Sequence, residues 1–351
     1  MHIPDGYLSP LTCATMYAAS APWWWAALRR TRRKLPGRRG PQLALFAAFS
    51  FVIMMFNLPL PGGTTGHAVG MGIAAIVLGP WASLLAISFA LTIQALFFGD
   101  GGITTLGANC FNMAIVGSFA AWGIYSLLSH GAAPESRRRV VAAALAGYGA
   151  INLSALLAAV EFGIQPMLFH DASGAPLYAP YPLRIAIPAM MLGHLTIAGI
   201  AEAVMCAGLF NYLRRNEPAL LNIPSPPVIA PRATSGMWVT LAVALLLTPL
   251  GILAGGAAWG EWAAKDFSTV ASRAQIASVS GATQLPASAP AGLARLSTLW
   301  TAPMPDYAPH RVIKSAAFGY LLSAMFGVGL ILSATWIAQR LWLFANQRRT
   351  E

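Results

Sequence analysis

Long apolar runs, separated by short polar segments, constrain this chain more than any other feature. A helix needs about 20 predominantly apolar residues to cross the hydrocarbon core of a bilayer. Only 9% of the residues are charged, against about a quarter in soluble domains, so the sequence indicates an all-α integral membrane protein. We expect nine candidate spans, at about 7–28, 41–58, 68–80, 81–98, 105–129, 140–164, 183–212, 236–257 and 315–343.

The basic residues gather on one side of these expected spans. With nine crossings, the groups within 29–39, 137–139, 214–232 and 340–349 share a side and hold 16 of the 22 Lys and Arg residues. Because cytoplasmic loops are enriched in Lys and Arg, we predict the N-terminus outside and the C-terminus inside. The first group follows the first apolar run, so we do not expect that run to be a cleaved signal peptide.

The chain is expected to divide at a Pro- and Ser-rich cytoplasmic linker, 222–235. Residues 1–221 would form a seven-helix bundle. Residues 236–351 would form a two-helix hairpin around an outer loop at about 258–314. Neither half carries a P-loop, because GGTTGH lacks the Lys-Ser/Thr ending and GDGGIT is only a partial glycine-rich motif.

Two polar loops on the predicted outer side are rich in Gly and Thr: NLPLPGGTTGHAVGMG (57–72) and FFGDGGITTLGANCFNM (98–113). Glycine allows close backbone approach, and irregular backbone at membrane depth is tolerated where protein or a cavity covers it. We therefore expect both loops to fold inward over a site.

The first two residues offer a compact set of metal ligands. The α-amine of Met1, the backbone nitrogen of His2 and its Nδ1 can wrap one ion in two fused chelate rings. His67, the histidine of the first Gly/Thr-rich loop, would add a fourth nitrogen, and such a tetragonal set suits Ni(II) or Cu(II) and accepts Co(II). The turn Ile3-Pro4-Asp5-Gly6 would bend this end back into the bundle. These ten residues alone also allow a turn with no metal.

Other polar residues lie near this expected site or inside the spans. Their side chains can orient the metal ligands or join helices by hydrogen bonds, and both interpretations stay open. The candidates near the site are Asp5, Thr64, Thr65, Asp100, Asn109 and Asn112, with Gln94, His194 and Glu202 as further polar residues within the spans.

Several stretches together resemble the CbiM/NikM family, the substrate-binding components of cobalt and nickel energy-coupling factor transporters. They are MHIPDG (1–6), FNLPLPGGTTGH (56–67), LGPWAS (78–83), IQALFFGDGGITTLGANCFNM (93–113) and GHLTIAGIAEA (193–203). The C-terminal hairpin resembles the CbiN/NikN accessory component through AWGEW (258–262) and LWTAPMPDY (299–307).

The resemblance implies a metal-capture subunit in a bacterial-type inner membrane. Its ligands would be Met1, through the amine, His2, through backbone and side-chain nitrogens, and His67. Co(II) or Ni(II) would be the transported substrate, with no organic cofactor. The partners would be a membrane-embedded coupling (T) subunit and cytoplasmic ATP-binding cassette ATPases, so the chain itself would not be an enzyme.

Two other classes of function remain as alternatives. A membrane metalloenzyme would need a motif such as HExxH, which does not occur. An ion-coupled secondary transporter predicts inverted repeats and carboxylates near the midplane. The sequence shows no convincing repeat and few carboxylates within the spans.

Overall fold

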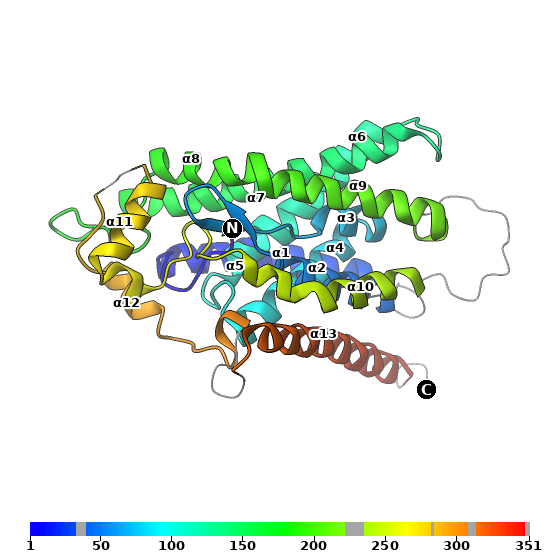
Figure 1. The fold of residues 1–351 in the computed structure, drawn as a ribbon. Helices are drawn as coiled ribbons and strands as arrows, with labels where there is room; N and C mark the ends of the chain where they lie inside the picture. The colour runs from blue at the N-terminus through cyan, green and yellow to red at the C-terminus, as the bar shows by residue number, and fades with distance from the viewer. Residues whose placement is uncertain (33–39, 222–234, 282–283, 308–313, 348–351) are drawn as a thin grey trace.

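The computed structural model describes residues 1–32, 40–221, 235–281, 284–307 and 314–347, and it is a bundle of helices (Figure 1). We call residues 1–221 the N-terminal part and residues 235–347 the C-terminal part. The predicted linker, 222–235, lies outside the described residues apart from Ser235, as does most of the basic group at 29–39.

Each expected apolar run contains a helix. The helices of the N-terminal part are α1 (Pro10–Thr31), α2 (Gly40–Met54), α3 (Met71–Leu78), α4 (Pro80–Ile93), α5 (Leu106–Asn109), α6 (Gly117–Ser129), α7 (Arg137–Leu168), α8 (Leu183–Gly193) and α9 (Gly199–Asn216). The C-terminal part contributes α10 (Ser235–Leu247), α11 (Val270–Val279), α12 (Ala291–Leu296) and α13 (Ala316–Gln347). Three π-helical turns continue the longer helices: η2 (Gln94–Phe98), η3 (Cys110–Val116) and η4 (His194–Ala198).

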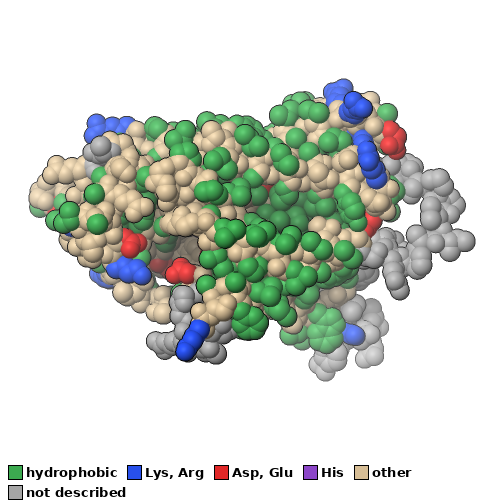
Figure 2. All heavy atoms as spheres, viewed as in Figure 1, with side chains coloured by type: hydrophobic (Ala, Val, Ile, Leu, Met, Phe, Trp, Pro, Cys, Tyr) green, Lys and Arg blue, Asp and Glu red, His purple; other side chains and the backbone are tan. Residues whose placement is uncertain are grey.

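Six helical segments among the described residues are long and apolar enough to cross a membrane. They are Pro80–Phe98, Leu106–Ser129, Arg137–Leu168, Leu183–Asn216, Gly236–Leu253 and Ala316–Leu341. Large hydrophobic side chains such as Leu145, Val204 and Leu246 are exposed on them, and Figure 2 shows hydrophobic side chains covering the visible flank of the bundle. A surface of this kind matches lipid, so the chain is a multi-pass membrane protein.

The expected third span is too short to cross by itself. Helix α3 has eight residues, which at about 1.5 Å per residue reach only about 12 Å of the roughly 30 Å hydrocarbon core. It begins after Gly70 and ends at Gly79, both with positive φ, and Pro80 then starts α4. All residues from Met71 to Ala75 are buried, so α3 is a short core helix.

Small residues let the central helices approach closely. Helix α7 packs against α6, α8, α9 and α3. A Cβ added to Gly72 of α3 would lie 2.8 Å from the Gly147 Cα of α7, so this crossing requires glycine. Small residues at helix crossings are the usual means of packing in membranes.

The loop-rich end of the molecule gathers segments that are distant in sequence. Strands β1 (Leu58–Leu60) and β2 (Thr64–Gly66) form an antiparallel hairpin with Leu58 opposite Gly66. The N-terminus lies beside this hairpin, and helices α11 and α12 of the C-terminal part lie at the same end (Figure 1). The ends of α9 and α13 lie at the opposite end (Figure 1). The predicted orientation in the membrane remains a prediction.

Candidate metal centre

The N-terminal residues are held inside the molecule by the second Gly/Thr-rich loop. Met1 is 3% exposed and His2 is 1% exposed. The side chain of Asn109 accepts from the Ile3 N–H at 2.8 Å and donates to the Ile3 carbonyl at 3.1 Å, and Gly102 N–H donates to the same carbonyl at 2.9 Å. Both the backbone N–H and the backbone carbonyl of Ile3 are therefore hydrogen-bonded, which fixes the position of the preceding residue, His2.

Asp5 is a second clamp on the same segment. Its carboxylate accepts from the backbone N–H of Ile103 at 3.0 Å and of Thr104 at 2.7 Å, and from the Thr104 hydroxyl. A Cβ added to Gly102 would lie 2.4 Å from the Asp5 nitrogen, so glycine is needed for this close approach. Asp5 therefore anchors the N-terminal segment, whereas neighbouring residues are the proposed metal ligands.

The rings of His2 and His67 lie side by side. Their centroids are 5.0 Å apart and their planes are inclined by 30°. The Nδ1 of His67 lies 3.0 Å from the Ala68 carbonyl, a contact that assigns the proton to Nδ1 and leaves the lone pair of Nε2 free. Burial, with repulsion from His2 and the N-terminal amine, lowers the pKa of His67 to about 3. A neutral His67 is ready to bind a metal ion.

Asp100 lies against His2. Its Oδ1 is 2.7 Å from His2 Nδ1, and its Oδ2 accepts from Gln94 Nε2 at 3.1 Å and from the Tyr307 hydroxyl at 2.5 Å. Burial by itself would raise the pKa of the Asp100 carboxyl. The charge of His2 and its contact, helped by His67 and Tyr307, outweigh burial and hold that pKa well below its usual range.

His2 Nδ1 lies close enough to the Asp100 carboxylate for an ion pair, but the two groups are not oriented for a hydrogen bond. Neither ring nitrogen of His2 has a hydrogen-bond partner among the residues that the structure describes. Buried polar atoms are normally satisfied, and an exception needs an explanation. A metal ion at Nδ1, the ring atom that the N-terminal chelate would use, would provide it for that nitrogen.

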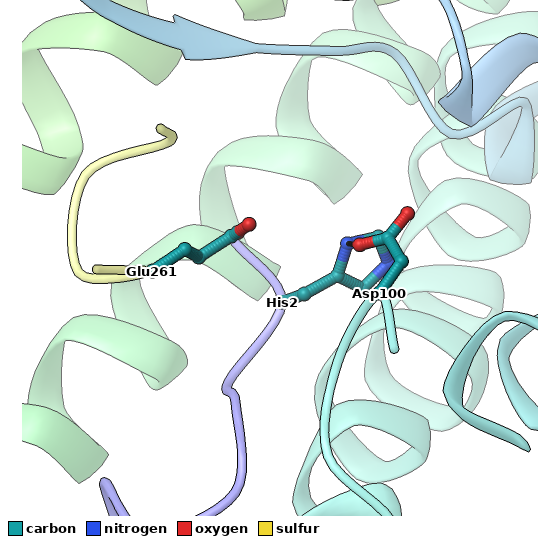
Figure 3. Close-up of side chains that lie close together, drawn as sticks. All are labelled: His2, Asp100 and Glu261. Carbon is teal, nitrogen blue, oxygen red and sulfur yellow. Dashed lines mark ion pairs between the residues drawn. The ribbon is translucent and has the colours of Figure 1, made fainter. Parts of the chain in front are cut away.

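Glu261 completes the surroundings of the terminus, and sequence reasoning did not single it out. Its Oε1 lies 3.1 Å from the Met1 amine, and its side chain is 18% exposed. Donor atoms of His2, Asp100 and Glu261 all lie within 4.8 Å of one another, with Glu261 reaching in from a separate loop (Figure 3). The available signal was a lone acid in the apolar stretch AWGEW.

The other candidates differ in how they relate to this centre. Glu202 accepts from the backbone N–H groups of Val69, Gly70 and Gly72, at 2.7, 3.0 and 3.2 Å, and so fixes the chain just after His67. Gln94 reaches the centre through Asp100. Both are connected to the ligands indirectly.

The side chains of the other four candidates make their polar contacts away from this centre. Thr64 and Thr65 donate to the carbonyls of Pro61 and Gly256, each at 3.4 Å. Asn112 donates to Glu161 on α7 at 2.9 Å, because the π-helical turn η3 separates its direction from that of Asn109. His194 lies 2.8 Å, through Nδ1, from the Met190 carbonyl of the preceding turn.

A cavity of about 430 Å³ adjoins the centre. Met1 is on its wall, together with the β1–β2 hairpin, helix α8 and residues of the C-terminal part such as Trp259 and Val279. His194 also lines this cavity. Met1 is thus shielded from solvent but borders this cavity.

Comparisons with known proteins agree across the chain. Residues 2–220 match CbiM, the cobalt uptake substrate-specific transmembrane region, and residues 235–343 match the PDGLE domain. A fused nickel transport protein NikMN of Rhodobacter capsulatus is 57% identical over 95% of both chains. A cobalt transport protein CbiM of Geobacter sulfurreducens is 32% identical over 77% of this chain and 76% of its own length.

A solved structure extends the agreement to the fold. The crystal structure of a transition metal transporter is 50% identical, covers 62% of this chain and 94% of its own, and superposes with a TM-score of 0.58. The resemblance seen in the sequence is thereby confirmed. The chain belongs to the CbiM family of cobalt and nickel transport proteins and carries a C-terminal PDGLE domain.

Proposed function

We propose that the chain is the substrate-capture subunit of an ATP-driven cobalt or nickel uptake transporter of the energy-coupling factor type. Co(II) or Ni(II) binds at the outer face of a plasma membrane to the Met1 amine, to the backbone nitrogen and Nδ1 of His2, and to His67. The observation that carries this proposal is the buried N-terminus, whose His2 ring lies 5.0 Å from the ring of His67.

The surroundings of His2 suggest how binding changes the site. In the chelate, Nδ1 of His2 bonds to the ion, whereas here it lies 2.7 Å from Asp100. Binding therefore exchanges this contact for a metal bond, and Asp100 remains as a negative charge beside the ion. The amine, the backbone amide of His2 and the imidazole give up their protons when they bind, so affinity falls in acid.

The division of labour follows from the same proposal. Residues 1–221 form the metal-binding domain, 222–235 a cytoplasmic linker, and 236–351 an accessory domain. The chain has no P-loop, so cytoplasmic ATP-binding cassette ATPases hydrolyse ATP and a membrane-embedded coupling subunit transmits the change. Relatives are named for nickel and for cobalt, and the donor set accepts both metals.

Uptake by reconstituted vesicles tests this function. We expect nickel or cobalt uptake only when the coupling subunit, the ATPases and ATP are all present, and no uptake with an ATPase that binds but does not hydrolyse ATP. Uptake by this chain alone, driven by an ion gradient, would instead establish an ion-coupled secondary transporter.

A further inference from the structure

The carboxylate beside the N-terminal amine comes from the C-terminal part. Glu261 Oε1 and Met1 N are 3.1 Å apart, although the two residues are 260 positions apart in sequence. Glu261 lies in the Glu261 loop, which we define as residues 257–262. Its side chain reaches toward His2 from that loop (Figure 3), and its Oε1 lies on the amine with which the proposed chelate begins.

The Glu261 loop is fixed by aromatic packing against the N-terminal part. The rings of Trp259 and Trp262, which flank Glu261 closely, pack on Tyr181 with centroid distances of 5.0 and 5.8 Å. Gly260 has φ +85°, and a Cβ there would lie 3.2 Å from the ring of Phe162, so the turn comes as close as glycine allows. The position of Glu261 is therefore set by surrounding structure.

The same loop is joined to both segments that carry the proposed ligands. Thr65, two residues before His67, donates its N–H to the Ala257 carbonyl at 3.3 Å and forms a parallel bridge with Ala258. Tyr7, five residues after His2, donates its hydroxyl to the Trp262 carbonyl at 2.7 Å. The loop thus links the hairpin before His67 to the N-terminal turn.

A second residue of the C-terminal part acts on the other carboxylate. The Tyr307 hydroxyl donates to Asp100 and accepts from Gln94 at 2.8 Å. Its ring stacks on Phe98 with centroids 4.7 Å apart. Both carboxylates at the centre, Asp100 and Glu261, are therefore supplied or oriented by the C-terminal part.

Electrostatics assigns a role to Glu261. A buried cation is costly unless opposite charge lies close to it. In this structure Glu261 faces the singly charged ammonium group of Met1. When the metal binds, this group loses a proton and a divalent cation takes the place of that proton. Among the described residues, the single group of three or more His, Cys, Asp and Glu that could hold a metal ion is His2, Asp100 and Glu261.

We propose, building on the function above, that Glu261 is the contribution of the C-terminal part to metal binding. It is a positioning residue that holds the Met1 amine in place and serves, with Asp100, as counter-charge to the bound divalent cation. The ion at this site is thus a borderline divalent metal ion, the class that nitrogen donors suit. The C-terminal part thereby shapes affinity at the site itself, through a named side chain.

Nickel titration of the purified full-length chain with an unmodified N-terminus tests this role. Glu261→Gln keeps the shape and an acceptor oxygen but removes the charge, and we expect affinity to fall about 10- to 100-fold. Asp266→Asn is the matched control. It removes a charge five residues along and keeps the acceptor for the Ala263 N–H, and we expect a change of less than about twofold.

Charge is separated from shape by Glu261→Asp, which we expect to recover part of the lost affinity. Thermal unfolding without metal should show that all three variants remain folded. Glu261→Gln with parental affinity, or Glu261→Asp folded but as weak as Glu261→Gln, would overturn the role of Glu261 and leave the proposed chelate standing. A parent chain that binds no nickel would instead overturn the proposed chelate.

Discussion

At the scale of single residues, the site depends on how each side chain is held. Asn109 and Asn112 are three positions apart, yet they serve different partners. Asn109 fixes both sides of the Ile3 peptide, whereas Asn112 donates to the buried carboxylate of Glu161. The same residue type therefore holds the segment that carries the proposed metal ligands in one place and joins two helices in the other.

This difference predicts separable effects. Asn109→Ala should lower nickel affinity about tenfold or more, because Ile3 and His2 lose their anchor. Asn112→Ala should lower the free energy of unfolding by about 1–3 kcal/mol, since it leaves a buried acceptor unpaired, with little change in affinity. Metal titration and thermal unfolding of both variants provide the check. Equal losses of affinity would contradict the assignment.

His67 predicts a characteristic dependence on pH. Its pKa of about 3 keeps it neutral in the free protein at ordinary pH, so it releases no proton on binding. Acid therefore weakens binding through the amine and His2, which do release protons. His67→Ala should weaken binding strongly at every pH. The slope of log Kd against pH, between about 5.5 and 7.5, should stay parental, and a shallower slope would show that His67 also loses a proton.

At the scale of elements, Glu202 on α9 holds the chain that leads from His67 into α3. Three backbone N–H groups at the start of α3 donate to its carboxylate. An anion at a helix N-terminus is favourable because it satisfies unpaired donors and the helix dipole. The buried acid is thus a connection between the bundle and the metal-bearing loop.

Glu202→Gln should therefore reduce both stability and metal affinity. Its amide offers one acceptor oxygen to three donors, so we expect the free energy of unfolding to fall by about 2–3 kcal/mol. Glu217→Gln is a useful comparison, because Glu217 accepts from the Gly236 N–H at 3.0 Å away from the centre. It should lower stability without changing nickel affinity. If Glu202→Gln also leaves affinity unchanged, Glu202 is purely structural.

The positions of the helices could be predicted from the sequence because apolar runs and Gly-Pro boundaries are local signals. The length of α3 and the phase change at η3 could not, since a positive φ at Gly70 and a π-helical turn are set by packing. Met1 and His2 were found as candidates because a terminal amine followed by histidine can chelate a metal ion, and His67 and Asp100 because they lie in distinctive Gly/Thr-rich loops. Glu261 and Tyr307 were not predicted, because their contacts with Met1 and Asp100 depend on how the C-terminal part folds back on the N-terminal part.

At the scale of the whole molecule, the N-terminal part and the C-terminal part meet at one centre. The N-terminal part supplies the terminus and His67, while Glu261 and Tyr307 of the C-terminal part lie on the amine and on Asp100. The cavity beside Met1 is likewise lined by residues of both parts. Under the proposed function, metal capture therefore depends on both parts of the chain.

The central claim is that the amine of Met1 binds the metal, and one measurement tests it most directly. Nickel affinity is compared for two purified full-length chains that begin at Met1, one with a free amine and one with that amine acetylated, with both masses verified. Acetylation removes the charge and the basic lone pair of the amine and so breaks the chelate without adding another donor. We predict that high-affinity binding is lost in the acetylated chain, and retained affinity would contradict the account.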